Sequence, residues 1–374
     1  MTTNYELLGR ENVDDIEAIL QISNTDVKEV QHVIEAESQT LFTWDYERSR
    51  PALAKLYEKA KTSQWNVTTD LDWSIEVDQA AVVIANEANM VRPFGEGIDV
   101  SGTVFETWTD DDWVKLGIES QNWTLSQFMH GEQGALICTA QIVETVPWID
   151  AKYYASTQVM DEARHVEVFS RYLDEKLSGH YPINAHLRML LDDIISDTRW
   201  DMTYLGMQIM VEGLALAAFG FMHQMTTEPL LKKLLRYVMS DEARHVAFGV
   251  LSLKEYYGQL TSKEIRERQE FAFEAAVRMR DRFLQQEVWD RMGVDVKEAL
   301  QLVLQDEGRK MFQGMLFSKI VPNCKKLGLL DAGDGWLRER FTELGVIQFE
   351  DWVDTGEEYA QLDEVAKDRE AQSA

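Results

Sequence analysis

The chain contains little proline, little cysteine and no excess of basic residues. Six prolines among 374 residues are few, and since proline disrupts helix interiors, their scarcity favours an all-α protein. The two cysteines, Cys138 and Cys324, are too few for a disulfide framework. Alone they also cannot hold an iron–sulfur cluster or a structural zinc ion. This cysteine usage fits a reducing cytoplasm, the compartment that we expect.

The charge balance is strongly acidic, with 65 Asp and Glu against 37 Lys and Arg, a formal net charge of −28. Such a surface repels phosphates, so nucleic acid is not an expected partner. Solubility is the simplest explanation of the charge, and attraction of Fe²⁺ or of a basic partner is the alternative. Because the longest apolar run, near 214–222, is too short to cross a bilayer, we expect no membrane span. The first residues also lack a signal-peptide pattern.

Breaks and composition divide the chain into four regions. They are an N-terminal helical region packing on the rest, a central four-helix bundle, C-terminal helices and an acidic tail, over 1–108, 109–260, 261–353 and 354–374. The fold class that we predict is therefore all-α, with a four-helix bundle core and additional N- and C-terminal helices. Arg92-Pro93 lies in the best candidate linker before the bundle.

Apolar periodicity and turn residues predict the four helices of the bundle. Asp110 opens an acidic first turn, which the helix macrodipole favours, and Pro147 and Pro229 mark turns. We expect the first helix to have a possible break near Thr124 and the third to be one long helix. The predicted ranges are 109–145, 150–177, 185–225 and 229–257.

An internal repeat is the most informative feature of the sequence. The pentapeptide Asp-Glu-Ala-Arg-His occurs at 161–165 and again at 241–245. The same offset of 80 residues pairs Glu132 with Glu212. The central region is therefore predicted to consist of two related helical hairpins.

The spacing of the repeat brings metal-ligating side chains together. Residues three apart share a helix face, so the Glu and His of each pentapeptide point the same way. An upstream Glu lies 30 residues before each pentapeptide Glu, with a turn at the midpoint. Each is thus about 15 residues, roughly 22 Å, from the turn, and antiparallel helices place the two at one level. We predict a two-metal site whose glutamates are also the catalytic residues, with ligands Glu132, Glu162, His165, Glu212, Glu242 and His245.

A solvated helix face is the alternative explanation of a single Glu-x-x-His. Two identical pentapeptides in matched hairpins make it improbable, and four buried carboxylates need compensating charge. Carboxylates with two imidazoles suit iron or manganese. We expect the aspartates to accept the spare ring N–H of the histidines and the arginines to pair with those aspartates, at Asp161, Arg164, Asp241 and Arg244.

Apolar residues and two glutamines near the ligands are candidates for a substrate pocket. Ordinary core packing is the alternative for the apolar ones, while buried glutamines need a hydrogen-bond partner. The candidates are Phe128, Leu136, Gln158, Gln208, Leu216 and Phe219.

The repeated pentapeptide with its upstream glutamates resembles the ferritin-like di-iron carboxylate enzymes. The similarity covers roughly residues 105 to 260 and is greatest to the oxygenase α-subunits of bacterial multicomponent monooxygenases. The resemblance implies a ferritin-like bundle that activates O₂ at two iron ions, Fe/Fe or Mn/Fe. It further implies electrons from a separate ferredoxin or reductase, a small-molecule substrate and a homodimer.

Three positions depart from patterns of these relatives. The monooxygenases have a threonine one turn after the third glutamate, where this chain has Leu216, so their route of proton delivery is not expected. Ribonucleotide reductase small subunits have a radical tyrosine where this chain has Phe169. Arylamine N-oxygenases add a histidine where this chain has Val238, which argues against that exact site but not against N-oxidation.

We therefore predict a non-haem di-iron oxygenase or oxidase, of monooxygenase type, that oxidises a small organic substrate. One alternative is a ferroxidase or peroxide scavenger like ferritins and rubrerythrins, and another is an arylamine N-oxygenase-like enzyme. A purely structural helical protein is a third. The number of irons bound per chain separates storage, with many, from an oxygenase, with two, and from a structural protein, with none.

Overall fold

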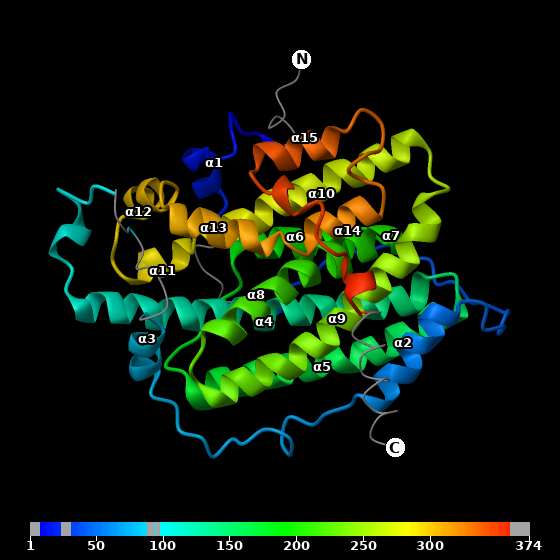
Figure 1. Ribbon diagram of the computed structural model, residues 1–374, viewed down its shortest axis with the longest axis horizontal. Coiled ribbons are helices and arrows are strands. Elements are labelled where there is room, and N and C mark those ends of the chain that lie inside the picture. Colours follow the sequence, from blue (N-terminus) through cyan, green and yellow to red (C-terminus); the bar gives the residue numbers. More distant parts are fainter. Residues whose placement is uncertain (1–7, 24–30, 88–93, 95–97, 360–374) are drawn as a thin grey trace.

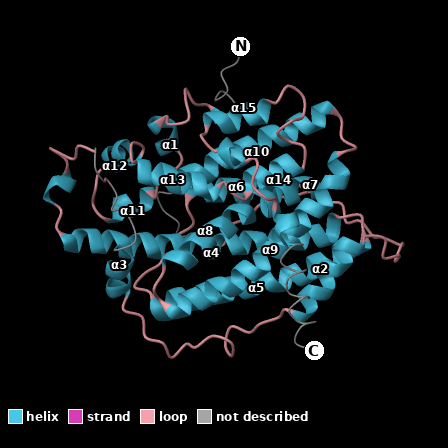
Figure 2. Cartoon of the chain, in the orientation of Figure 1, coloured by secondary structure: helices cyan, strands magenta, loops and turns pink. Residues whose placement is uncertain are grey.

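The described part of the chain is built from helices joined by turns and irregular segments. The computed structural model describes residues 8–23, 31–87, 94 and 98–359, and no strand occurs among them (Figure 2). The all-α fold class predicted from the sequence is confirmed for these residues.

The first hairpin consists of two unbroken helices, α4 (Asp110–Thr145) and α5 (Ile149–Lys176). Thr109 caps α4, and its backbone N–H donates to Asp112 Oδ2 (2.8 Å). The break expected near Thr124 does not occur. Its neighbours Trp123 and Leu125 are fully buried, and this packing outweighs the modest helix propensity of threonine.

The first arm of the second hairpin is interrupted before its turn. The single helix expected over 185–225 is wrong: α6 (Ala185–Ser196) is followed by α7 (Trp200–Tyr204), the π-helical segment η3 (Leu205–Val211) and α8 (Glu212–Met225). At the break, Asp197 Oδ1 accepts the backbone N–H of Arg199 (3.1 Å), a local bond that competes with helix continuation. After the turn, α9 runs over Pro229–Tyr257.

These helices pack into one four-helix bundle. Helix α4 spans the molecule, α5 packs along it, α9 packs on α5, and η3 with α8 closes the bundle between α9 and α4 (Figure 1). Helix α2 (Pro51–Thr62) lies against α5 and α9. The level of the predicted ligands therefore falls inside the main hydrophobic core.

The regions on either side of the bundle differ in helix content. In the predicted N-terminal helical region, residues 31–50 and 63–78 form no helix, although α1, α2, α3 and η2 lie there, over Ile16–Gln21, Pro51–Thr62, Gln79–Glu87 and Val104–Thr107. The C-terminal helices form a layer above the bundle in Figure 1. They are α10 to α15 and η4, over Ser262–Arg282, Gln286–Arg291, Val296–Val303, Glu307–Leu316, Ile320–Lys326, Trp336–Glu343 and Ile347–Phe349. The four predicted regions remain predictions.

The start of the predicted acidic tail is part of the packed structure. Thr355 is 1% exposed, and its backbone N–H donates to Asn323 Oδ1 (2.9 Å). Asp354 pairs with Lys326 at 2.8 Å. The remainder of the tail, 360–374, and the candidate linker at Arg92-Pro93 lie outside the described residues.

One helical stretch, Trp200–Met225, is long and apolar enough to cross a membrane by length and composition. Within the fold, 78% of its apolar window is buried. The core helix of a bundle passes the same test, so this stretch does not by itself indicate a membrane span.

Candidate metal centre

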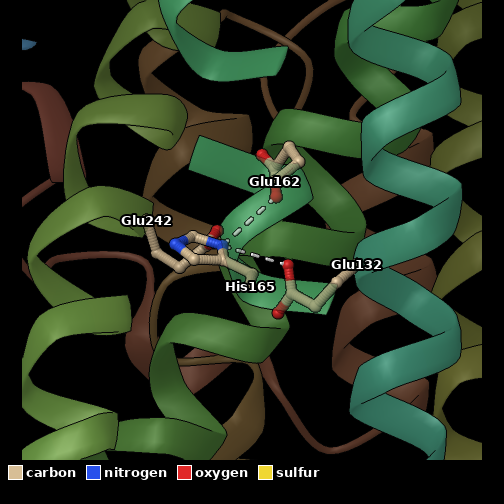
Figure 3. Close-up of side chains that lie close together, drawn as sticks. All are labelled: Glu132, Glu162, His165 and Glu242. Carbon is tan, nitrogen blue, oxygen red and sulfur yellow. Dashed lines mark hydrogen bonds and ion pairs between the residues drawn. The ribbon is translucent and has the colours of Figure 1, made fainter. Parts of the chain in front are cut away.

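Six buried side chains from the bundle helices converge at one level. Two groups of potential ligand atoms, each within 4.8 Å of one another, are formed by Glu132, Glu162, His165 and Glu242 and by Glu162, Glu212 and His245. Figure 3 shows the first group, with the Glu132 and Glu162 carboxylates turned toward the His165 ring. The structure thus brings all six predicted ligands together, and Glu162 belongs to both groups.

The histidine rings have a defined orientation. Nδ1 of His165 lies 3.3 Å from Glu162 Oε2 and 3.1 Å from Glu242 Oε1. Nδ1 of His245 lies 3.0 Å from Glu162 Oε1 and 3.6 Å from Glu242 Oε1. Both rings therefore present Nδ1 to the carboxylates, and Glu162 and Glu242 each approach both histidines, as carboxylates shared by two metal ions would.

The opposite ring nitrogens are held crosswise by the two aspartates. Nε2 of His165 donates to Asp241 Oδ2 (3.2 Å), and Nε2 of His245 donates to Asp161 Oδ2 (3.3 Å). Each histidine is therefore held by the aspartate of the other pentapeptide. These bonds fix Nδ1 of both rings as the nitrogen free to bind a metal ion.

The two arginines close the aspartate layer. Arg164 donates to the Asp161 carboxylate and to Asp241 Oδ2 (3.1 Å). Arg244 donates to the Asp241 carboxylate and to Asp161 Oδ2 (3.3 Å). Two carboxylates and two guanidiniums thus balance each other in a layer that is almost completely buried.

Two residues that sequence reasoning did not select complete this layer. The Trp65 indole N–H donates to Asp241 Oδ2 (2.7 Å), and its ring stacks on His165 at 6.4 Å between centroids. Gln64 Oε1 accepts from Arg164 Nη1 (2.7 Å). Both lie in the irregular segment after α2, so no periodicity marks them, and only the packing of that segment on the bundle reveals them.

Several buried ligand atoms at the centre lack a hydrogen bond, and they allow a test of whether metal ions fit there. Five buried ligand atoms have no hydrogen-bond partner among the described residues: Glu162 Oε2, Glu212 Oε2, both carboxylate oxygens of Glu242 and His245 Nδ1. Burying such atoms without a hydrogen bond is costly, and bound cations would satisfy all of them. Four carboxylates would also balance the charge of two divalent ions. The donor set therefore fits two ions of the iron or manganese type, either Fe/Fe or Mn/Fe.

Without metal ions the carboxylates have widely separated pKa values. Burial raises the pKa of Glu132 to about 8, and the charge of Glu242 adds to the rise. Burial, followed by the charge of Glu162, raises the pKa of Glu212 well above its ordinary value. Burial acts in the same direction on Glu162, but nearby histidines, His245 first, outweigh it and hold its pKa below the ordinary range.

The histidines retain protons in the same state. Burial lowers the pKa of His165, but its hydrogen bonds, that to Asp241 first, raise it well above the ordinary value. Burial also lowers the pKa of His245, and the charge of Glu162 is the first of several influences that raise it well above the ordinary value. The metal-free centre is therefore a proton-holding cluster, and metal ions must displace those protons.

The two glutamines near the ligands have different surroundings. Gln158 Nε2 donates to Glu162 Oε1 and to Glu212 Oε1, both at 3.0 Å, and so joins the two hairpins. Gln208 is fully buried in η3, and neither its amide oxygen nor its amide nitrogen has a partner among the described residues. Gln158 positions ligands, whereas Gln208 has hydrogen-bonding capacity available.

The predicted apolar pocket residues do not surround one space. Phe128 and Phe219 pack against each other at 4.6 Å between centroids, and both contact Phe169. These rings fill the region next to the first hairpin. Leu136 is only half-buried on α4, whereas Leu216 lines a cavity on the other side of α8.

Comparisons with known proteins give neighbours among solved structures. No family model matches the chain, and no curated protein matches it. Among solved structures, a mutant R2-like ligand-binding oxidase with a reconstituted Mn/Fe cofactor is 18% identical, with a TM-score of 0.48, covering 76% of this chain and 94% of that one. Two further mutants of that oxidase are each 17% identical. Their TM-scores are 0.47 and 0.46, covering 76% and 75% of this chain and 94% of each of theirs. At this level of similarity we draw the function from the centre alone.

Proposed function

We propose that the protein is an O₂-dependent di-metal oxidoreductase that oxidises a small organic substrate. The observation that carries the proposal is the buried set of four glutamates and two histidines, in which five ligand atoms have no hydrogen-bond partner among the described residues. Two iron ions, or one manganese and one iron, would supply the reduction of O₂ when bound there. We further propose a monooxygenase-type reaction, with electrons from a separate ferredoxin or reductase.

The chain's own contribution is to hold the ligands and exclude water. Gln158 orients Glu162 and Glu212, and the crosswise aspartates orient the histidine rings. The rings of Phe128, Phe169 and Phe219 pack together next to the centre, a cluster that keeps bulk water away. Such rigid support and a dry interior are what a site performing oxidation in a protein core needs.

The test begins with metal content and O₂ uptake. Protein loaded anaerobically with Fe²⁺, or with Mn²⁺ and Fe²⁺, should retain about two ions per chain after desalting, as measured by plasma mass spectrometry. Mixing with O₂ should consume about one O₂ per metal pair and produce a transient visible absorbance. Candidate substrates can then be compared by how they change its decay.

Two results would count against the proposal. Uptake of many irons per chain would indicate a ferroxidase or storage protein instead. Metal content near zero, with Glu162→Ala indistinguishable from the parent protein, would leave the repeated pentapeptides as structural ion-pair layers.

A further inference from the structure

An exposed arm, residues 38–48, is fixed to the bundle along one of its sides. It forms no helix or strand and extends beyond the helices at the end of the bundle where α4 turns into α5 (Figure 1). The backbone N–H of Leu41 donates to the Glu144 carbonyl oxygen (2.8 Å), and the Thr43 hydroxyl donates to the Pro147 carbonyl oxygen (2.9 Å). These bonds hold the arm in one position against the turn.

Three aromatic side chains of this arm face the solvent. Phe42, Trp44 and Tyr46 are 67%, 80% and 59% exposed. The rings of Phe42 and Trp44 contact each other at 4.5 Å between centroids, whereas Thr43, between them in sequence, directs its hydroxyl to the bundle. Side chains two residues apart in an extended chain share a face, so the three rings lie on the outward side. Aromatic side chains grouped on an exposed surface are typical of interaction sites.

The backbone of the arm is also accessible for pairing. Over residues 38–46, the bond from Leu41 to Glu144 is the only hydrogen bond to another backbone group within the described part of the chain. Exposed N–H and C=O groups next to an apolar face form a surface to which another extended segment can add.

The sequence of the arm is complementary to itself about Trp44. In an antiparallel pair of two arms centred on this residue, Phe42 of one copy lies opposite Tyr46 of the second copy, and the two Trp44 residues lie opposite each other. The acidic residues of the arm, Asp45 and Glu47, then face uncharged residues. Aromatic pairs across two strands are stabilising, and like charges in such positions are not.

The exposed area of the three rings is close to what a dimer requires. An aromatic side chain offers about 150–250 Å², so the exposed parts of the rings amount to roughly 300–500 Å² per chain. Two copies would bury roughly 600–1,000 Å² from the rings alone, and a specific interface needs about 1,000 Å² in total. The paired backbones and the residues next to the rings supply the remainder.

We infer that the arm binds a second copy of this chain by antiparallel pairing of the two arms about Trp44. The resulting dimer is symmetric, because each copy offers the same surface to the other. A net charge of −28 makes two copies repel each other over most of their surface. Contact through aromatic rings is therefore the least costly, and it requires neither metal ions nor the oxidation proposed above.

Sedimentation velocity of the full chain, with and without metal ions, tests the dimer. The parent protein should sediment at twice the chain mass of 43.1 kDa, with a dissociation constant in the micromolar range because the interface is small. Trp44→Ser should weaken dimerisation about tenfold or more, since an aromatic residue at the centre of an interface carries much of the binding energy. Trp352→Ser, at a residue that is 57% exposed outside the arm, is the matched control and should change nothing.

Cysteine cross-linking tests the register of the pair. Pairing about Trp44 places Leu41 of one copy opposite Glu47 of the second copy. Two Leu41 residues, or two Glu47 residues, would instead lie about 20 Å apart along the strands. A mixture of Leu41→Cys and Glu47→Cys chains should therefore form disulfide-linked dimers, and neither variant alone should. Both native cysteines are buried and do not interfere.

Three results would overturn the assignment. A monomeric parent protein would do so, and its sedimentation with phosphatidylcholine vesicles would assign the arm to a lipid surface instead. A dimer that Trp44→Ser leaves unchanged would place the interface elsewhere. Disulfide formation by Leu41→Cys alone would exclude the antiparallel register. Because Trp44 is exposed, Trp44→Ser should keep the Tm of the parent protein, which separates loss of contact from loss of folding.

Discussion

The two hairpins supply equivalent ligands by different backbone routes. The first consists of two continuous helices, α4 and α5, and Phe128 of α4 packs against Phe169 of α5. The second breaks at 197–199 and passes through the π-helical segment η3 immediately before Glu212. The distance along the chain from the upstream glutamate to the pentapeptide glutamate is the same in both hairpins. The break and the π-helical segment of the second hairpin therefore both lie before Glu212.

This difference indicates which half is shaped for ligands. A π-helical turn displaces the side chains before it, and such turns occur often at functional sites. Here η3 carries Gln208, whose amide has no hydrogen-bond partner among the described residues, and α8 and α9 border a cavity. The first hairpin thus consists of continuous helices, and the second carries both the irregular segment and the border of the cavity.

The largest effect should come from Glu162, the residue that belongs to both ligand groups. Glu162→Ala should reduce metal content from about two ions per chain to none, because Glu162 belongs to both ligand groups. Glu132→Ala should retain at least one ion, on the group that includes Glu212 and His245. Plasma mass spectrometry after iron loading measures both. Glu144→Ala, exposed on the same helix as Glu132, is the control, and two ions in Glu162→Ala would contradict the sharing.

Substituting an aspartate of one pentapeptide should weaken the metal bound by the histidine of the other. Asp241→Asn should weaken the metal bound through His165, in the first hairpin, by about 10–100-fold, because it loosens that ring. Competition titrations of double variants measure this. Asp241→Asn should be non-additive with His165→Ala and additive with His245→Ala. The reverse pattern would show that each aspartate serves its own pentapeptide.

Lowering the pH should weaken metal binding, by less than the substitutions above. Because the pKa of Glu132 is about 8 without metal, a metal ion must displace its proton below that pH. Affinity should therefore rise with pH, by up to about tenfold per unit for each displaced proton, and the contribution of the Glu132 proton to this rise should end above pH 8. Chelator competition between pH 6 and 9 measures it, and Glu132→Gln should flatten the dependence by one proton.

The same pKa shift predicts the opposite trend for stability of the metal-free protein. The folded-state pKa of Glu132 lies above its ordinary value of 4.5. Its stabilising contribution is therefore complete below pH 4.5 and is lost as pH rises through about 8. The Tm of the metal-free protein should therefore fall less over this range in Glu132→Gln than in the parent protein, and an equal fall in both would show that Glu132 contributes nothing to it.

The smallest effects should distinguish the packing of the two hairpins. A Cβ at Gly249 would lie 2.7 Å from Gln208 Cβ, so Gly249→Ala should destabilise the second hairpin by about 1 kcal/mol. In the first hairpin nothing lies within 4 Å of a Cβ at Gly131, and Gly131→Ala should stabilise by about 0.5–1 kcal/mol. Urea unfolding measures the change in the free energy of unfolding for both variants. Changes of the same sign would contradict the predicted difference between the hairpins.

The parts of the centre that sequence could predict depend on local geometry. Glu162 and His165 share a face because of helical spacing, and the hairpin turns set the level of Glu132 and Glu212. Trp65 and Gln64 could not be predicted, because they reach the aspartate layer from an irregular segment whose path depends on tertiary packing. The same limit applies to the break at 197–199, where one aspartate bonded to the backbone outweighs a continuous apolar pattern.

The cavity was beyond sequence reasoning for a related reason. Its lining extends from Lys59 to Tyr359, residues that no periodicity connects. The pocket predicted from the sequence was composed of apolar residues near the ligands. Two of these, Phe128 and Phe219, instead pack against each other and leave no space between their rings. Which apolar side chains face each other and which leave a space depends on packing across helices.

The crosswise aspartates also bear on the history of the chain. Because Asp161 holds His245 and Asp241 holds His165, a substitution in one pentapeptide acts on a ligand of the other. Had the two hairpins arisen by duplication of one, neither pentapeptide could have changed without affecting a ligand of the other. The two pentapeptides are still identical although the helices around them have diverged in sequence and in path, which is the trace that such mutual dependence would leave.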